Sequence, residues 1–169
     1  MTGKPANVAT YRKAVVDLAV AEKPRVVVEV GVASGGLSRM LLTVPSMQQL
    51  VLVDLWPGHW CNYGQKHMDK VAAEVFAWAA TEPRVRVLRL YTAEAADLFA
   101  DGSVDFFHTD SEHSLEGIRA DIKAWLPKVR AGGILSGDNY EVPTVAQGVD
   151  EAFPGRSLAA NGRVWWTRK

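Results

Sequence analysis

The chain has 169 residues, of which 48% are hydrophobic and 22% are charged, a balance that is ordinary for a soluble globular protein. Its length predicts a single domain over residues 1–169 that buries roughly 70% of the surface of the unfolded chain. Because 19 basic and 19 acidic side chains leave a net charge of zero, without a basic patch, we expect neither nucleic acid nor a membrane surface as a partner.

Helical and strand patterns alternate along the chain. Helices are predicted over 7–21, 34–42, 66–80, 92–99, 114–126 and 145–153, and strands over 25–30, 50–54, 84–90, 103–109 and 133–137. After them, Asn161-Gly162 is a strong two-residue turn signal and predicts a hairpin between 157–160 and 163–167. Strands joined through helices indicate an α/β fold: a Rossmann-like, doubly wound, mostly parallel sheet with a C-terminal antiparallel hairpin. Ligands of such sheets bind beyond the carboxyl ends of the strands.

The first predicted strand runs into a glycine-rich loop. Residues 25–30 are R-V-V-V-E-V, a β-branched run typical of a strand buried on both faces, and residues 31–36 are G-V-A-S-G-G. Free amide groups in such a loop, and the positive end of the following helix dipole, favour a nucleotide-like ligand. The spacing is not the G-x-G-x-x-G of dinucleotide sites, and a carboxylate at position 29 suits hydroxyl or ammonium groups better than several phosphates. We expect the ligand to contact Glu29, Gly31, Ser34 and Gly35.

A second acid lies where the next strand ends. Asp54 stands 23 residues after Gly31 and is followed by Leu55. In a doubly wound sheet the second strand lies beside the first, so Asp54 would face the glycine loop and accept hydrogen bonds from both ribose hydroxyls of a nucleoside. The alternative is a glycine turn in an ordinary α/β protein, with Asp54 as a solvated strand end. The two features together favour a nucleoside site.

Polar side chains also follow the fourth and fifth predicted strands. Asp110 comes after one strand, and Asp138 and Asn139 come after the other, at the same edge of the sheet. Their hard oxygen donors suit a magnesium ion, which would lower the pKa of a substrate hydroxyl. His113 is expected to accept the hydroxyl proton, because its ordinary pKa of about 6.5 suits a base at neutral pH. As alternatives, Asp110 caps the helix that begins near Ser114, and Asp138 and Asn139 form a turn.

Other reactive or aromatic side chains are weaker candidates. Cys61, the single cysteine, has no obvious partner base and excludes an internal disulfide. His108 lies within a buried strand, which favours a structural role. Trp56 and Trp60 flank the loop after the second strand, where they either contact a ligand or anchor the loop. The N-terminus lacks the apolar core of a signal peptide, and no apolar run reaches membrane-spanning length, so we expect a cytoplasmic protein.

Three segments carry a resemblance to a known family: VVVEVGVASGG, VLVDLW and VDFFHTDSEHSLEGIRADIKAWLPKVRAGGILSGDNY. Together they resemble the class I S-adenosylmethionine-dependent methyltransferases, and in particular the methyltransferase 24 family, which contains the macrocin and mycinamicin sugar O-methyltransferases. The resemblance covers roughly residues 25–150. It implies S-adenosylmethionine as the cofactor, contacted by Glu29, Gly31, Ser34, Gly35, Asp54, Leu55, Thr92, Ala93 and Asp110.

The same resemblance implies the chemistry. By likeness to catechol O-methyltransferase, a magnesium ion would be held by Asp110, Asp138 and Asn139, and the catalytic residues would be Asp110 and His113. The reaction would transfer a methyl group to a hydroxyl of a small molecule or sugar. Two departures from the family pattern are Leu115, where an aromatic residue is usual, and Glu112, which stands for the second acid of the motif.

The short chain offers few segments to cover the acceptor, namely 7–21, 56–64 and 140–144. The site is therefore open, covered by a neighbouring subunit of a homo-oligomer, or built for a large acceptor. Other functions also fit parts of the pattern: a metal-independent N- or O-methyltransferase, and a non-catalytic protein that binds S-adenosylmethionine or S-adenosylhomocysteine. The strand-end acids argue against the non-catalytic protein. The glycine spacing and the lack of a Tyr-x-x-x-Lys pair argue against a nicotinamide oxidoreductase.

Overall fold

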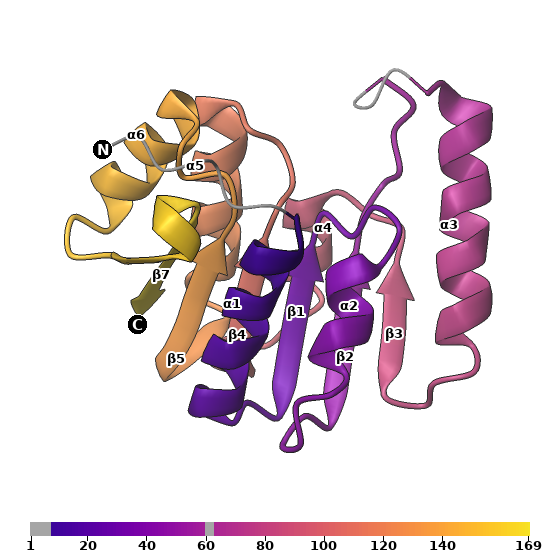
Figure 1. Ribbon diagram of the computed structural model, residues 1–169, viewed down its shortest axis with the longest axis horizontal. Helices are drawn as coiled ribbons and strands as arrows, with labels where there is room; N and C mark the ends of the chain where they lie inside the picture. Colours follow the sequence, from indigo (N-terminus) through magenta and orange to yellow (C-terminus); the bar gives the residue numbers. More distant parts are fainter. Residues whose placement is uncertain (1–7, 60–62) are drawn as a thin grey trace.

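The computed structural model describes residues 8–59 and 63–169, and within these ranges seven strands form one sheet (Figure 1). The strands are β1 (Val26–Val30), β2 (Gln49–Val53), β3 (Val85–Leu88), β4 (Val104–Thr109), β5 (Val129–Gly137), β6 (Ser157–Ala159) and β7 (Val164–Arg168). Their spatial order is β3-β2-β1-β4-β5-β7-β6; β1 to β5 are parallel, and β7 is antiparallel to both β5 and β6. The predicted α/β fold with a C-terminal antiparallel hairpin is confirmed.

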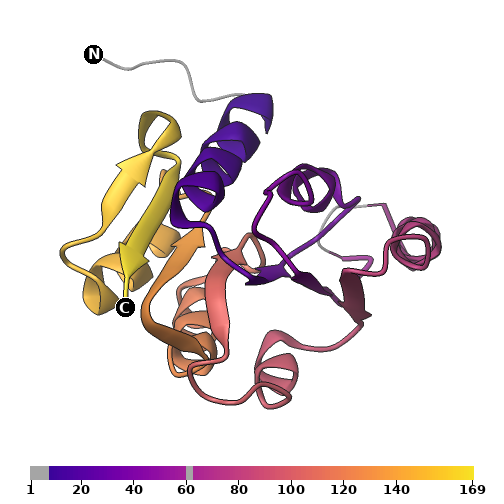
Figure 2. The same cartoon turned by 90° about the horizontal axis from the view of Figure 1, so that it is seen from below.

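Helices cover both faces of the sheet (Figure 2). One face carries α1 (Val8–Glu22), α2 (Gly36–Leu41) and α3 (Gln65–Ala79), and the other carries α4 (Thr92–Ala96), α5 (Leu115–Trp125) and α6 (Pro143–Ala152). Successive strand residues alternate between the two cores: Val27 and Phe106 pack under the first group, and Val28 and Phe107 under the second. This double burial explains why the strands are continuous apolar runs. None of the described helices is long and apolar enough to cross a membrane.

The C-terminal hairpin contains the predicted Asn-Gly pair, but in a longer turn than expected. A 3₁₀ turn, η1 (Ala160–Gly162), joins β6 to β7, and both Asn161 (φ +58°) and Gly162 (φ +87°) adopt left-handed backbone conformations. Arg163 follows the turn, and its carbonyl accepts a hydrogen bond from the amide of Tyr140 at 2.9 Å. The hairpin therefore brings Arg163 beside the segment that follows β5.

The carboxyl ends of β1, β2 and β4 are joined by main-chain hydrogen bonds. The amide of Gly31 donates to the carbonyl of Val53 at 3.0 Å, and the amide of Asp110 donates to the carbonyl of Val30 at 2.9 Å. Gly31 has a φ of +83°, and a Cβ at this position would overlap the carbonyl oxygen of Asp110, so only glycine allows this close approach. Strand order reverses between β1 and β4, which is where ligands bind in such sheets.

Trp125 connects α5 to α4. Its buried ring stacks on Phe107, with centroids 5.0 Å apart, and meets the edge of Phe99 at 5.1 Å. Its indole Nε1 donates to Oγ1 of Thr92 at 2.8 Å. Because Thr92 begins α4, this hydrogen bond fixes the start of that helix at the carboxyl edge of the sheet.

Candidate active site

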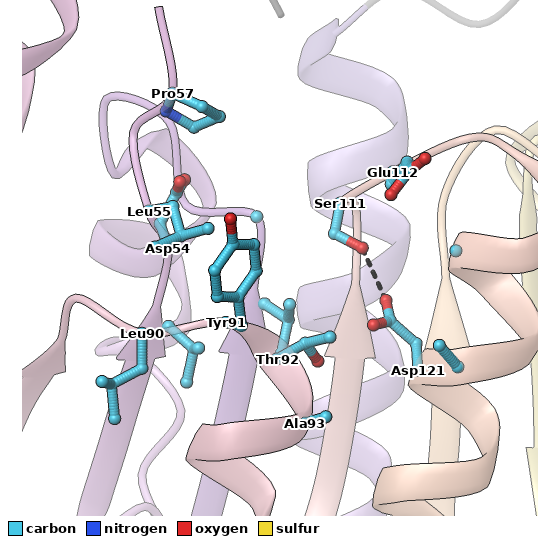
Figure 3. A pocket seen from close by; sticks show the side chains of 15 residues that line it. Asp54, Leu55, Pro57, Leu90, Tyr91, Thr92, Ala93, Ser111, Glu112 and Asp121 are labelled. Atoms are coloured by element: carbon cyan, nitrogen blue, oxygen red, sulfur yellow. Dashed lines mark hydrogen bonds between the residues drawn. The ribbon is translucent and has the colours of Figure 1, made fainter.

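Two adjoining pockets lie beyond the carboxyl ends of the parallel strands. The first has a volume of about 280 Å³, and Figure 3 shows the side chains that line it. The second has a volume of about 370 Å³. The pockets share the wall residues Gly31, Asp54, Pro57, Ser111 and Glu112. They are therefore two halves of one cleft at the edge where the sequence predicted a site.

More than half of the predicted site residues line this cleft. Those in the first pocket are Gly31, Asp54, Leu55, Thr92 and Ala93. Those in the second pocket are Gly31, Asp54, Asp110 and His113. The structure thus brings the ends of β1, β2 and β4 and the start of α4 around one space, and the roles of these residues stay predictions.

Asp54 joins the glycine loop to the segment after β2. Its Oδ2 accepts a hydrogen bond from the amide of Ala33 at 2.9 Å, and its Oδ1 accepts one from the amide of Trp56 at 2.6 Å. Burial raises the pKa of Asp54, and the hydrogen bonds from the amides of Trp56 and Ala33 are the strongest effects that oppose this rise. Each carboxylate oxygen keeps a second lone pair, so Asp54 can still accept hydrogen bonds from a ligand in either pocket.

The other predicted residues of the glycine loop line neither pocket. Gly35 precedes α2 with a φ of +74°, and the carbonyl of Ser34 accepts a hydrogen bond from Nη1 of Arg39 at 2.7 Å. Glu29 is 2% exposed, and its Oε2 has no hydrogen-bond partner among the described residues. Burial, which outweighs the opposing effect of the nearby Ser38 hydroxyl, raises the pKa of Glu29 to about 8. Glu29 is therefore a buried acid that is uncharged at neutral pH, and its Oε2 is available as a hydrogen-bond acceptor.

The raised pKa of Glu29 makes the free energy of unfolding depend on pH. The carboxyl of Glu29 ionises near pH 4.5 in the unfolded chain and near pH 8 in the fold, so between these values the folded state holds the extra proton. Relative to Glu29→Gln, the wild type should therefore lose up to about 1.4 kcal/mol of unfolding free energy per pH unit as pH rises through this window. Urea denaturation between about pH 5.5 and 7.5 measures the difference. Glu74→Gln, on the exposed face of α3, is the control and should behave like the wild type; parallel profiles for wild type and Glu29→Gln contradict the prediction.

Asp110 and His113 form a pair in the second pocket. Nε2 of His113 lies 3.4 Å from Oδ1 of Asp110, and the His113 side chain is 44% exposed. The hydrogen bond to Asp110 raises the pKa of His113; burial opposes this rise, and the charges of Asp110 and Asp138 add to it. A histidine with a carboxylate partner and access to a pocket has the arrangement of a general base.

The capping role considered for Asp110 belongs to another residue. Ser114 is the N-cap of α5, and its Oγ accepts a hydrogen bond from the amide of Gly117 at 3.0 Å. Oγ1 of Thr144 donates to the carbonyl of His113 at 2.6 Å, which ties this loop to α6. The carboxylate of Asp110 is therefore available to His113 rather than used by the helix.

The predicted metal ligands are brought together, but in a form that does not suit a magnesium ion. The side chain of Asp138 has no exposed surface, and Arg163 donates Nε to its Oδ1 at 2.7 Å and Nη2 to its Oδ2 at 2.6 Å. The side-chain amide of Asn139 has one terminal atom 3.0 Å from Oδ1 of Asp110 and 3.2 Å from Oδ2 of Asp138; both contacts are hydrogen bonds when the amide is oriented with its nitrogen toward the two carboxylates. In the part of the chain that the structure describes, no three His, Cys, Asp or Glu side chains are grouped to hold a metal. The magnesium prediction is not supported.

Asp121 of α5 lines the first pocket without having been expected from the sequence. Asp121 is 1% exposed and accepts hydrogen bonds from Oγ1 of Thr109 and Oγ of Ser111, each at 2.5 Å. Figure 3 shows the hydrogen bond from Ser111. Burial raises the pKa of Asp121, and these hydroxyls lower it. In the sequence, Asp121 lies at helical spacing among the apolar residues Ile118 and Ile122, which places it on the buried face of α5. A carboxylate at such a buried helix position is the signal that could have identified Asp121.

Tyr91 and Arg163 were also not expected from the sequence. Tyr91 is 64% exposed, and Figure 3 shows its ring in the first pocket; it directly precedes the predicted Thr92, which is the signal that could have found it. Arg163 follows Asp138 by 25 residues and comes from the hairpin, so no local pattern connects them. Arg163 reaches Asp138 through tertiary packing, which a pattern of neighbours along the chain does not contain.

The weaker candidates have structural roles where the structure describes them. Trp56 is fully buried, and its Nε1 donates to the carbonyl of Ala33 at 2.8 Å, so it anchors the loop. His108 is fully buried, with Nδ1 3.0 Å from Oγ of Ser136, and burial lowers its pKa. Trp60 and Cys61 lie outside the described residues.

The sequence profile of a family described as a methyltransferase domain, methyltransferase 24, matches residues 28–140 of the chain. A Staphylococcus aureus protein assigned as a caffeoyl-CoA O-methyltransferase superposes with a TM-score of 0.71 at 14% identity, over 94% of this chain and 83% of that chain. Spermidine synthase from Thermotoga maritima gives 0.65 at 16% identity, over 96% of this chain and 60% of that chain. At these identities the likeness shows the fold alone.

A curated relative is the uncharacterised protein y4gI of Sinorhizobium fredii, which is 32% identical over 92 residues. The match includes 53% of this chain and 10% of that protein, so the chain corresponds to about a tenth of the length of this relative. The family profile includes the glycine loop and all the strand-end acids described above, which confirms the resemblance seen in the sequence. The chain belongs to the methyltransferase 24 family of class I S-adenosylmethionine-dependent methyltransferases.

Proposed function

We propose that the protein transfers a methyl group from S-adenosylmethionine to a hydroxyl oxygen of a small molecule or sugar. The observation that carries this proposal is the pair of Asp110 and His113, 3.4 Å apart, in a pocket that shares a wall with the first pocket. An oxygen nucleophile must lose its proton as it attacks, so a base beside the donor site favours a hydroxyl acceptor.

The residues of the first pocket suit the nucleoside part of the methyl donor. Asp54 offers lone pairs for ribose hydroxyls, and Thr92 and Ala93 form the wall expected to contact the adenine. Gly31 lets a ligand approach the backbone closely. These donors and acceptors match a neutral-to-cationic nucleoside better than a polyphosphate.

S-adenosylmethionine supplies an electrophilic methyl group on a positively charged sulfur. During transfer the bond from carbon to sulfur breaks, with both electrons kept by sulfur, and the acceptor oxygen forms the new bond to carbon. Because Nε2 of His113 faces the carboxylate of Asp110, Nδ1 is the ring nitrogen that takes the hydroxyl proton, and Asp110 stabilises the resulting imidazolium, as its effect on the pKa of His113 supports. Positioning of the two reacting atoms contributes much of the remaining rate.

The test is a transfer assay with the purified protein. Methyl-labelled S-adenosylmethionine is incubated with sugars and phenols, and mass spectrometry identifies the products and any S-adenosylmethionine or S-adenosylhomocysteine that purifies with the protein. Equal amounts of an O-methyl ether and S-adenosylhomocysteine support the proposal. Methylation on nitrogen contradicts the hydroxyl acceptor, and tight donor binding with no turnover on any acceptor favours the non-catalytic binding protein instead.

A further inference from the structure

Arg163 is held beside Asp138 by contacts to α1 and to the segment that follows β5. Its Nε and Nη2 donate to both oxygens of Asp138, at 2.7 and 2.6 Å. Its guanidinium carbon lies 4.5 Å from the centre of the Tyr11 ring on α1, and a nitrogen lies 3.7 Å from Glu141. The side chain is only 20% exposed. A guanidinium held by two parallel hydrogen bonds and an aromatic face is a fixed positive charge.

A continuous series of polar contacts leads from Arg163 to the proposed base. Arg163 binds Asp138, and the amide of Asn139 lies 3.2 Å from Asp138 and 3.0 Å from Asp110. Asp110 in turn lies 3.4 Å from His113. The orientation of Asp110 toward His113 therefore depends on a network that starts at the guanidinium.

Arg163 adds a positive charge beside Asp110, Asp138 and Asn139, the residues that the sequence predicted as magnesium ligands. The carboxylates of Asp110 and Asp138 would together offset a divalent cation, but the guanidinium already offsets one of them. A divalent cation here would lie close to a group of the same sign, and Asp138 would have to weaken two charge-assisted hydrogen bonds. Magnesium also demands near-octahedral oxygen ligands and keeps several waters, whereas the Asp138 side chain has no exposed surface.

We infer that Arg163 takes the place of a divalent cation in this site and that methyl transfer by this protein requires no metal. The inference rests on the proposed function. Proton removal then depends on His113, and Arg163 is a positioning residue that acts through Asp138 and Asn139 on Asp110.

Binding of Mn²⁺, followed by electron paramagnetic resonance, tests the inference independently of activity, because Mn²⁺ prefers the same oxygen ligands as Mg²⁺. The wild type is expected to show no saturable binding up to about millimolar Mn²⁺, the affinity range of weak cation sites. Arg163→Gln leaves the two carboxylates uncompensated and should bind Mn²⁺ at least about tenfold more tightly than the wild type. Adding Asp138→Asn to Arg163→Gln should abolish this gain.

Two control variants show whether Mn²⁺ binding depends on the positive charge at position 163 or changes whenever any arginine is removed. Arg163→Lys keeps the positive charge and should exclude Mn²⁺ as the wild type does. Arg119→Gln removes a guanidinium that holds Glu151 through the same two-bond geometry at an exposed site, and it should leave Mn²⁺ binding unchanged. Circular dichroism establishes that Arg163→Gln folds, since it leaves a buried carboxylate without its partner; if it does not fold, the wild-type measurements decide.

Saturable Mn²⁺ binding by the wild type would overturn the inference, and so would transfer activity that EDTA abolishes and Mg²⁺ restores. A folded Arg163→Gln that binds Mn²⁺ no better than the wild type also contradicts it. Transfer that is unaffected by EDTA supports it. If no acceptor is methylated at all, the proposed function fails, whereas the Mn²⁺ measurements still decide whether Arg163 excludes a cation.

Discussion

His113→Ala is expected to lower kcat for methyl transfer by about 10²–10⁴-fold, the usual contribution of a positioned general base. Without the imidazole, the acceptor hydroxyl has only solvent to take its proton. The affinity for S-adenosylmethionine should stay within about twofold, because His113 lines the second pocket and not the first. Initial rates at saturating donor measure the first effect, and calorimetry measures the second.

Two further variants show whether the effect belongs to the base. His113→Gln can still hydrogen-bond to Asp110 but cannot take a proton at neutral pH, so it should be about as slow as His113→Ala. His67→Ala removes an exposed histidine on α3, whose ring lies 4.7 Å from Tyr63, and should keep full activity. Normal turnover in both His113 variants would dismiss His113 as the base.

The second large effect is expected for donor binding. Asp54→Ala should raise the dissociation constant for S-adenosylmethionine by about 100-fold, because each hydrogen bond between a charged group and a ribose hydroxyl contributes about 1.5 kcal/mol. Asp54 stands in the wall that both pockets share. Calorimetric titration of the purified variant with S-adenosylmethionine and with S-adenosylhomocysteine measures the change.

Asp54 also holds two backbone amides, which calls for controls on the loop itself. Asp54→Asn keeps one acceptor oxygen for the loop while losing the charge, and we expect an intermediate affinity. Asp17→Ala removes an exposed acid of α1 that pairs with Lys13, and this variant should bind the donor as the wild type does. Unchanged affinity in Asp54→Ala would remove this residue from the donor site.

The central strands could be predicted from the sequence because strands buried on both faces are continuous runs of apolar, often β-branched residues. β1 (Val26–Val30) and β2 (Gln49–Val53) agree with the predicted runs to within a residue at each end, since β-branched residues buried on both faces do not suit a surface helix. The end of α4 was less predictable. The helix stops at Ala96, and Phe99 beyond it packs against Trp125 of α5 at 5.1 Å, a tertiary contact that no local pattern contains.

The site was predictable where it depends on topology. Asp54 and Asp110 follow β2 and β4, the two parallel strands that flank β1, so their meeting at one edge follows from the strand order. Arg163 was not predictable, because its position depends on how β7 packs against β5. Nor could the sequence decide between a metal and a guanidinium at Asp138, because carboxylate oxygens bind both.

The contact between Gly31 and the carbonyl of Asp110 limits how this protein can diverge. Gly31 follows β1 and Asp110 follows β4, and there is no room for even one additional methyl group between these two residues. The segment after β4 leads directly to His113. Variation that reshapes the acceptor side can accumulate in the parts of the hairpin and of α1 away from Arg163 and Tyr11 without disturbing this point. Any side chain at position 31 would shift the donor site and the base at the same time, so descendants of this protein must inherit the two together or lose both.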